Sequence, residues 1–358
     1  MATTAVGLDI GTSGVRAAQM SLGKGPATLE RFGQVALPPG AVRDGEVVDV
    51  PTVAAAIKQL WSSAKFSSKK VVLGVANQRV IVRQVDLPWL PISEMKASLP
   101  LQVQDLVPMP IEQAILDFHP VEEFVNDQGA RMMRVLLVAA ARDMVHAALE
   151  SASKAGLTVT QVDLTPFAVL RSLGSVDTTG ADPGAHSTAE ALVDVGAKVT
   201  NIVIHSNGVP RFVRVLLMGG DSITDAVAER MGIPFEQAEG VKQQLSLGQM
   251  PGIPATDHPA ARVVEAVGSS FVDEIRGSLD YYLAQSSSYP LRQLVIGGGG
   301  ARLGGLVQRL ALATRLPVQP ASVLSTIQIG KTGLSPEQLS YVEPLATVPV
   351  GLAMGVAS

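Results

Sequence analysis

The chain has 358 residues, of which 47% are hydrophobic and 17% are charged, and its net charge is −4. It is long enough for two domains, can bury a large core, and lacks the basic excess of proteins that mainly grip nucleic acid. It has no cysteine, which excludes disulfides, thiolate metal sites and cysteine nucleophiles. The first residues, MATTAVGLDIG, lack the basic and apolar regions of a signal peptide, and no window of about 18 apolar residues follows. We therefore expect a soluble cytoplasmic protein without direct membrane insertion.

The chain contains an internal repeat. Residues 5–22, AVGLDIGTSGVRAAQMSL, and residues 191–208, ALVDVGAKVTNIVIHSNG, each read as a short apolar strand, an Asp-x-Gly turn and a second apolar strand. The separation of the two copies, about half the chain, predicts two lobes of one α/β topology. A third strand and a helix are expected after each hairpin, at 28–37 and 53–65 in the first copy and at 211–218 and 221–231 in the second.

One segment of the first half does not fit the repeat. An apolar strand at 71–76 precedes residues 77–162, in which strands and helices alternate. We interpret 77–162 as an inserted α+β subdomain, in which Pro100 interrupts the first helix. The expected elements are strands at 79–87 and 131–141 and helices at 93–106 and 142–155.

Composition also predicts the domain boundaries. The first lobe would span residues 1–173, with a core of 1–76 and 163–173 around the insertion. Residues 174–190 are rich in Gly and Asp and read as a linker, and residues 191–358 would form the second lobe. Further elements are expected in the second lobe: a loop at 246–262, a helix at 260–285, a strand and glycine turn before a helix at 291–316, and an apolar last helix.

The first hairpin turn has the residues of a phosphate site. Its sequence, Asp9-Ile10-Gly11-Thr12-Ser13-Gly14, combines a carboxylate with two glycines and two hydroxyls. Glycines let backbone N–H groups approach phosphate oxygens, and the hydroxyls of Thr12 and Ser13 add donors. Asp9 can hold Mg²⁺, directly or through water, and Arg16 can act as a phosphate counter-charge. Taken alone, the turn is equally compatible with a plain hairpin.

A second acidic turn, Asp194-Val195-Gly196, occupies the matching place in the second repeat. Two such tips, from equivalent lobes, would face each other across a cleft and clamp a Mg-phosphate group. Asp9 and Asp194 are therefore the candidate metal-holding pair. Glu239 and Lys242 lie one helical turn apart and, from the sequence alone, read as a solvated ion pair.

A glycine run provides the third element. A strand leads into Gly297–Gly300, and a helix follows, an arrangement suited to close approach of a nucleotide. A Rossmann dinucleotide site fits poorly, because Arg302 or Leu303 falls where the third glycine belongs. No acidic residue between Asp280 and Glu337 is available to hold a ribose. A buried strand-to-helix turn is the structural alternative.

These three elements, in this order, resemble the phosphate-1, phosphate-2 and adenosine motifs of the actin, heat-shock chaperone and sugar-kinase superfamily. Longer runs resemble the PilM family, the actin-like cytoplasmic proteins of type IV pilus assembly, which are related to FtsA. The resemblance extends from Val6 to about Gly355. It implies a duplicated actin-like ATPase (ribonuclease H-like) fold with two lobes, a nucleotide cleft and an FtsA-style inserted subdomain. The runs that carry it are VGLDIGTSGVRAAQM, LPPGAVRDGEVVDVPTVAAAIKQLW, VPMPIEQAILDFHPV, VLLVAAARDMV, VDLTPFAVLRSL and LLMGGDSITDAVA.

The resemblance also implies a site. ATP with Mg²⁺ would lie between the lobes, with Asp9 and Asp194 on the metal and Asp163 as the candidate base for the attacking water. Arg16 stands where relatives commonly carry Lys, which changes the geometry of the phosphate contact, and the second turn, GAKVT, is less rich in glycine, which would weaken phosphate binding. Because the sequence offers no clear base beyond Asp163, we expect ATP binding with slow or absent hydrolysis. The residues that would hold the nucleotide are Gly11, Thr12, Ser13, Arg16, Gly196, Ala197, Lys198, Gly219, Gly220, Asp221, Glu239, Lys242, Gly298, Gly299, Gly300 and Arg302.

The partner implied by the resemblance is the short cytoplasmic N-terminal peptide of PilN, docking at the inserted subdomain. PilN pairs with PilO in the inner membrane, so the protein would be recruited to the inner face of the membrane by its partner. Three alternatives remain open: a superfamily small-molecule kinase, a filament-forming protein like FtsA or actin, and a scaffold without nucleotide. The chain shows no polar cluster for sugar hydroxyls and no basic amphipathic end, and self-association remains open.

Overall fold

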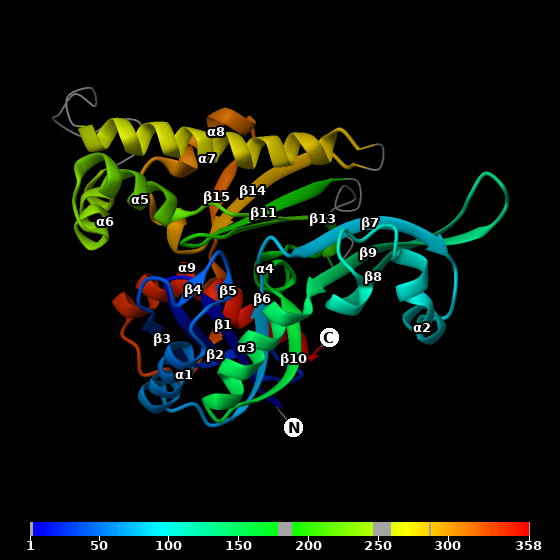
Figure 1. Cartoon of the computed structure of the whole chain (residues 1–358), viewed down its shortest axis with the longest axis horizontal. Coiled ribbons are helices and arrows are strands. Elements are labelled where there is room, and N and C mark those ends of the chain that lie inside the picture. The colour runs from blue at the N-terminus through cyan, green and yellow to red at the C-terminus, as the bar shows by residue number, and fades with distance from the viewer. Residues whose placement is uncertain (1–2, 178–187, 246–258, 286–287, 358) are drawn as a thin grey trace.

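The computed structural model describes residues 3–177, 188–245, 259–285 and 288–357. Two lobes, each built on a central sheet, lie one above the other in Figure 1, and a smaller three-stranded sheet projects to one side. The expected α/β organisation is confirmed. Among the helices of the described ranges, none combines the length and the apolar composition that a bilayer crossing requires.

The first sheet carries the first hairpin. Strands β1 and β2 pair antiparallel from Thr3↔Leu22 to Gly11↔Gly14, so Thr12 and Ser13 form the tip. Both faces of β1 are buried, since Leu8 packs toward the core with α1 while Ala5 packs in the core with α9. In the sheet order the strands are β10 (Thr158–Leu164), β6 (Lys70–Val75), β1 (Thr3–Gly11), β2 (Gly14–Leu22), β3 (Thr28–Ala36) and β16 (Gln328–Ile329).

Two helices and a small hairpin cover the first sheet. Helix α1 (Val50–Ala64) begins at Asp49, whose side chain accepts a hydrogen bond from the Thr52 N–H. Helix α3 (Arg142–Lys154) packs beside α1, and both bury apolar residues in one core cluster. The hairpin of β4 (Val42–Arg43) and β5 (Glu46–Val47) lies on the cleft side of this lobe.

The second sheet repeats the hairpin plan. Strands β11 and β12 pair antiparallel from Glu190↔His205 to Val195↔Thr200, which makes Gly196–Val199 the second tip. In the sheet order the strands are β13 (Val209–Leu216), β12 (Thr200–Ser206), β11 (Ala189–Val195), β14 (Leu291–Gly297) and β15 (Val318–Pro320). The helices of its outer layer are α5 (Gly220–Met231), α6 (Phe235–Gln244), α7 (Pro259–Leu283) and α8 (Leu306–Thr314).

Two helices lie between the lobes. Val169 of α4 (Thr165–Leu173) and Leu352 of α9 (Pro336–Met354) pack in one cluster with Val72 of the first sheet and Leu192 of the second. Gly7 of β1 is needed here, because a Cβ at that position would lie 2.0 Å from the Pro349 carbonyl oxygen of α9. The tight central layer therefore fixes both sheets against the same pair of helices.

The last part of the chain returns to the first lobe. Strand β16 pairs with β3, and α9 packs on β1 and β2. The predicted boundaries placed all of residues 191–358 in the second lobe; the packing instead puts residues 323–354 on the first sheet. The physical reason is that α9 buries apolar residues on both sides, which only a position between two sheets can satisfy. The short 3-10 turns of the chain are Ile111–Gln113, Gly299–Arg302, Val323–Ser325 and Gly355–Ala357.

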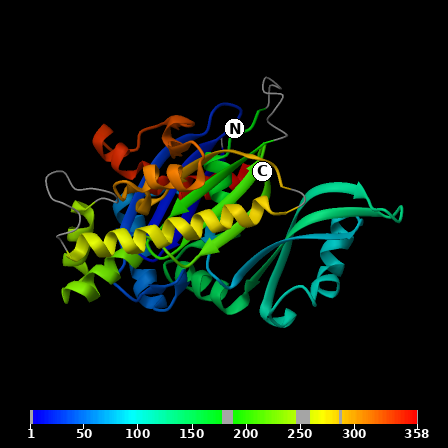
Figure 2. The same cartoon turned by 90° about the horizontal axis from the view of Figure 1, so that it is seen from above.

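The insertion is smaller than predicted. Its sheet has the order β7 (Val80–Pro88), β9 (Arg131–Ala141) and β8 (Ala114–Val125), and α2 (Ile92–Val103) covers one face with Pro100 inside the helix. Figure 2 shows these elements extending away from both lobes. Helix α3 and strand β10, expected inside the insertion, belong to the first lobe because β10 pairs with β6. Strand β8 was missed by the sequence analysis.

Part of the predicted loop structure lies outside the described residues. This applies to most of the linker at 174–190 and to most of the loop at 246–262. The predicted strands and helices that flank them are present with shifts of a few residues, for example β3 at Thr28–Ala36 and α7 at Pro259–Leu283.

Candidate functional site

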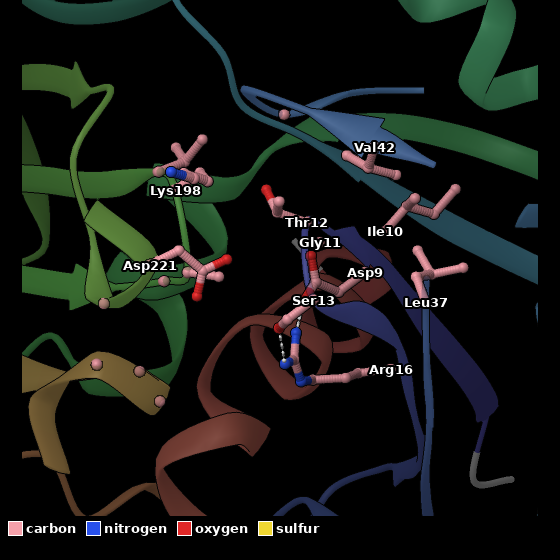
Figure 3. Close-up of a pocket in the computed structure, with 18 of the residues that line it drawn as sticks. Asp9, Ile10, Gly11, Thr12, Ser13, Arg16, Leu37, Val42, Lys198 and Asp221 are labelled. Atoms are coloured by element: carbon pink, nitrogen blue, oxygen red, sulfur yellow. Dashed lines mark hydrogen bonds and ion pairs between the residues drawn. The ribbon is translucent and has the colours of Figure 1, made fainter. Parts of the chain in front are cut away.

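A cleft of about 990 Å³ separates the two lobes. Figure 3 shows Thr12 and Ser13 of the first tip opposite Lys198 and Asp221 of the second lobe. The cleft has polar walls toward the second lobe and an apolar wall under the β4–β5 hairpin, where Leu37 and Val42 lie. It is therefore the place where the two halves of the repeat meet.

The first tip pairs its carboxylate with a cation. Asp9 and Arg16 lie directly opposite in the β1–β2 register, and Arg16 Nη1 is 3.6 Å from Asp9 Oδ2. Arg16 Nη2 also donates to Ser13 Oγ at 3.1 Å. Burial raises the pKa of Asp9, and the charge of Arg16 and its hydrogen bond partly oppose the rise. Within the described residues, the buried Nε of Arg16 has no hydrogen-bond partner, so one N–H group of the guanidinium is not used as a donor.

The second tip pairs its carboxylate with an amide. Asp194 faces Asn201 in the β11–β12 register, and its side chain accepts a hydrogen bond from Asn201. Burial raises the pKa of Asp194 to about 7, and the charge of Asp9 adds to the rise, while Arg16 and the Asn201 hydrogen bond oppose it. Sequence reasoning missed Asn201, although it follows Asp194 by the same seven residues that separate Asp9 from Arg16. This repeated spacing was the sequence signal that could have identified Asn201.

The second tip is held against helix α5. The N–H groups of Gly220 and Asp221 donate to the carbonyls of Gly196 and Ala197 at 3.0 and 2.8 Å. Gly219 is required for this contact, because a Cβ there would lie 2.4 Å from the Gly196 oxygen. Lys198 forms an ion pair with Asp225. Gly219 itself is absent from the described cleft lining, and it acts by holding the tip in place.

Glu239 and Lys242 form a buried corner of the cleft. Lys242 Nζ lies 2.6 Å from Glu239 Oε2 and donates to the Gly220 carbonyl at 3.1 Å and to Thr224 Oγ1 at 2.8 Å. Lys242 is only 9% exposed, so the prediction of a solvated ion pair was wrong. Burial raises the pKa of Glu239, but hydrogen bonds from Lys242 and Thr224 more than offset this and lower it overall. The tertiary contact with α5 buries Lys242, whereas the side chain of Glu239 stays 30% exposed.

The glycine turn packs directly on the second tip. Gly298 has φ +82°, and a Cβ there would lie 2.4 Å from the Val195 oxygen, so only glycine fits without strain. A Cβ on Gly300 would lie 2.4 Å from Val195 Cγ1. Arg302 lies 4.3 Å from the centre of the Tyr341 ring and donates to the Tyr341 carbonyl. This element therefore connects the second tip to α9.

Asp163, the candidate base, lies apart from the cleft. Its carboxylate forms an ion pair with Arg171 and accepts a hydrogen bond from the Leu164 N–H, and it is absent from the described lining. The remaining predicted residues of the site do line the cleft: Asp9, Gly11, Thr12, Ser13, Arg16, Asp194, Gly196, Ala197, Lys198, Gly220, Asp221, Glu239, Lys242, Gly298, Gly299, Gly300 and Arg302.

The carboxylates and amide of the cleft suit a metal ion whose other ligands are water and phosphate. Among the residues that the structure describes, no group of three or more His, Cys, Asp or Glu side chains is arranged to hold a metal. Asp9 and Asp194 provide two carboxylates, and Asn201 Oδ1 is a buried acceptor without a hydrogen-bond partner in the described residues. Because Mg²⁺ keeps several waters and is often bound through one or two carboxylates plus phosphates, these residues fit Mg-phosphate.

The chain is similar in sequence to FtsA, a cell division protein. Over 264 residues it is 25% identical to the cell division protein FtsA of Bacillus subtilis, covering 67% of this chain and 57% of that protein. Over 341 residues it is 25% identical to FtsA of Streptococcus pneumoniae, covering 84% of this chain and 72% of that protein. The chain therefore spans little more than half the length of the first of these relatives.

Solved structures show the same fold. A structure described as the "PilM-PilN type IV pilus biogenesis complex" matches with a TM-score of 0.84 and 26% identity, over 99% of this chain and 98% of that chain. MreB5 of Spiroplasma citri bound to ADP matches with a TM-score of 0.52 and 12% identity, over 99% and 98% of the two chains. The predicted actin-like fold is confirmed.

The sequence profile of one family covers almost the whole chain. The profile, described as "Type IV pilus assembly protein PilM", matches residues 7–356. This range includes both hairpin tips, the insertion and the glycine turn. The chain therefore belongs to the PilM family of type IV pilus assembly proteins.

Proposed function

We propose that the protein is an ATP-binding adaptor in type IV pilus assembly. The observation that carries the proposal is the pair of facing tips, in which Asp9 with Arg16 on one lobe opposes Asp194 on the other. The charge of Asp9 adds to the raised pKa of the buried Asp194, so the two carboxylates favour a cation near them, and Mg-ATP supplies one together with its phosphates. Membership of the family supports the role in pilus assembly.

The nucleotide would bridge the lobes. The β- and γ-phosphates would meet Gly11, Thr12 and Ser13 on one side and the Gly196–Lys198 turn on the other, with Arg16 as counter-charge. When bound, Mg²⁺ would neutralise the phosphates and the two aspartates. The adenosine would lie along Gly298–Gly300 and Arg302, beside the Glu239–Lys242 corner.

Binding is better supported than fast hydrolysis. Rapid hydrolysis needs a base within reach of the attacking water, and the candidate Asp163 is engaged by Arg171 outside the described lining. We therefore propose a slow ATPase at most, in which ATP acts as a ligand that sets the angle between the lobes.

The partner would be the cytoplasmic N-terminal peptide of a PilN-like protein. The structural relative with a TM-score of 0.84 is described as a PilM-PilN complex, which supports a partner of this class. We propose that the peptide docks on the inserted subdomain, residues 80–141, and that the PilN-PilO pair thereby recruits the protein to the inner face of the membrane. ATP would adjust the affinity for the peptide by changing the cleft angle.

Calorimetric titration of a synthetic PilN-like N-terminal peptide into the full chain, with and without Mg-ATP, tests the proposal. We expect peptide binding whose affinity changes with Mg-ATP, and we expect Asp9→Ala to remove the change. Asp280→Ala, which removes an exposed aspartate from α7 on the outer layer, is the matched control and should behave as the wild type. Titration of Mg-ATP alone reports the nucleotide site separately.

Each result bears on a different part of the proposal. Absence of peptide binding under every condition would overturn the adaptor role. Absence of Mg-ATP binding in the wild type would overturn the nucleotide site and favour a scaffold without nucleotide. Equal Mg-ATP binding by the wild type and Asp9→Ala would exclude the first tip as the phosphate site.

A further inference from the structure

A row of alternating charges joins the inserted sheet to the second lobe. Asp86 on β7 lies opposite Arg134 on β9, and Arg134 lies opposite Glu122 on β8. Arg134 Nε and Nη2 hold the Asp86 carboxylate at 2.7 and 3.0 Å, and Nη1 pairs with Glu122. The other Glu122 oxygen lies 3.5 Å from Nη1 of Arg211, which belongs to β13 of the second sheet. The row therefore runs from the insertion to the second lobe.

Two β-bulges create this contact. On β8 the register shifts between Pro120 and Glu122, so the extra residue Val121 allows Glu122 to lie opposite Arg134. On β13 the partners jump from Phe212 to Pro210, which leaves Arg211 as the extra residue. A bulge bends its strand and re-aims a side chain, and bulges gather next to functional sites. Here Glu122, which follows the bulge on β8, meets Arg211, the bulged residue of β13, so a carboxylate and a guanidinium from different sheets lie together.

Arg211 is anchored firmly on the second lobe. Its side chain is only 16% exposed, and its guanidinium lies 5.1 Å from the centre of the Tyr289 ring. Its buried Nε has no hydrogen-bond partner among the described residues. The charge of Arg211 is thus tied to the second lobe and directed at Glu122. Tyr289 is in turn held on the same lobe, since its backbone N–H donates a hydrogen bond to Tyr282 Oη at 2.9 Å.

The insertion is covalently attached to the other lobe. The chain enters it after β6 and leaves it into α3, and both elements belong to the first lobe. It nevertheless lies against β13 through β7, where Val82 packs in the cluster that contains Val213. A change in the angle between the lobes must therefore either break the contact between Glu122 and Arg211 or move the insertion with the second lobe.

We propose that Arg211 is a positioning residue that couples the nucleotide cleft to the partner-binding insertion through Glu122. The proposal rests on the function proposed above and names the contact through which its coupling would run. Arg211 touches neither nucleotide nor peptide; it sets the orientation of the insertion relative to the second lobe. An interaction that is made in one lobe arrangement and lost in the other supplies the two-state element that coupling requires.

The test is a set of matched charge removals in the full chain. Arg211→Gln and Glu122→Gln break the contact between the lobes. Glu123→Gln is the control, since Glu123 is one residue away and pairs with Arg131 at 2.7 Å inside the insertion. Arg211→Lys keeps the charge and should retain part of the coupling. Circular dichroism and thermal melting of each variant show whether it is folded.

The readout is the ratio of peptide affinities with and without Mg-ATP. We expect Arg211→Gln and Glu122→Gln to bring this ratio close to 1, a change of about two- to fivefold, because partly exposed ion pairs contribute on that scale. Their affinity for Mg-ATP alone should stay within about twofold of the wild type. The double variant should behave like either single variant, because both remove one shared contact.

The outcomes separate this inference from the function on which it rests. A wild-type ratio above or below 1 that is unchanged in both Gln variants overturns the role of Arg211 and leaves the adaptor intact. A wild-type ratio of 1 with peptide binding intact overturns the coupling as a whole. Loss of the ratio in Glu123→Gln as well shows a general effect of charge on the insertion, and it also overturns the specific contact.

Discussion

The two hairpin tips of the cleft start from the same Asp-x-Gly pattern and end with different electrostatics. In the first tip, Asp9 lies opposite a cation, Arg16, and in the second tip Asp194 lies opposite a neutral amide, Asn201. Both carboxyls have a raised pKa because of burial, and for Asp194 the value reaches about 7. The same strand register therefore produces one tip with an internal counter-charge and one without.

This difference gives the tips different tasks. The first tip is balanced within its own hairpin, so Arg16 can turn to a phosphate while Asp9 stays close to it. In the second tip Asp194 lies opposite a neutral amide, and the charge that opposes the rise in its pKa comes from Arg16 of the first tip. Under the proposed function the first tip would bind the phosphates and the second tip would need a cation, and the three predictions below separate these roles.

The largest expected effect is on nucleotide affinity. Arg16→Ala should weaken Mg-ATP binding about 30-fold, because it removes a charge-assisted hydrogen-bond donor from the first tip. Asn201→Ala changes the residue at the equivalent place of the second tip and should cost less than about fivefold. Titration with a fluorescent ATP analogue measures both. Equal losses in the two variants would show that the tips contribute alike and would contradict the comparison.

The next largest effect is on the stability of two glycine variants, one at Gly298 in the glycine turn that packs on the second tip and one at Gly11 at the first tip. Gly298→Ala should lower the free energy of unfolding by about 2–3 kcal/mol, because φ is positive there and the new Cβ meets the Val195 carbonyl. Gly11→Ala should cost less than about 1 kcal/mol, because the nearest atom is the end of the flexible Arg16 side chain, 3.0 Å away. Urea denaturation compares the two. A larger loss for Gly11→Ala would show that the first tip tolerates a Cβ less well than the glycine turn and would contradict the comparison.

The smallest effect is a pH dependence of the nucleotide-free protein. The pKa of Asp194 is about 7 in the folded chain, above its ordinary value of about 4. Its contribution to stability is therefore complete below about pH 4 and is lost as the pH rises through 7. Asp194→Asn should raise the melting temperature at pH 8 by about 3 °C relative to the wild type and change it little at pH 4. An equal shift at both pH values would mean that the effect does not come from titration.

The insertion shows where sequence reasoning is weak. Strand β9, RMMRVLLVAAA, was predicted because it is a continuous apolar run with buried residues along its length. Strand β8, AILDFHPVEEFV, was missed because it alternates irregularly, contains Pro120 and has a bulge before Glu122. One of the polar residues that break its pattern, Glu122, belongs to the charged row that reaches Arg211, so part of what obscured the strand is also part of the contact between the insertion and the second lobe.

The site was predictable to the extent that it is local. Asp9 and Asp194 were found because a turn between two strands must present its tip residues in one place, and Gly298 because a glycine run links a strand to a helix. Asn201 could have been found by applying the spacing of the first hairpin to the second. The burial of Lys242 could not, because it depends on Thr224 and Gly220 of another helix.

The amino-acid sequence by itself determined the repeat, the two acidic tips, the glycine turn and the family, since each is set by a short run of residues. Only the tertiary structure decided that residues 323–354 return to the first lobe, that α3 and β10 lie outside the insertion, and that Glu122 meets Arg211. The physical reason is that helix packing and contacts between sheets depend on which surfaces remain to be buried. A local sequence pattern does not specify which surfaces pack together. That packing depends on the whole chain, in which both sheets contact α4 and α9.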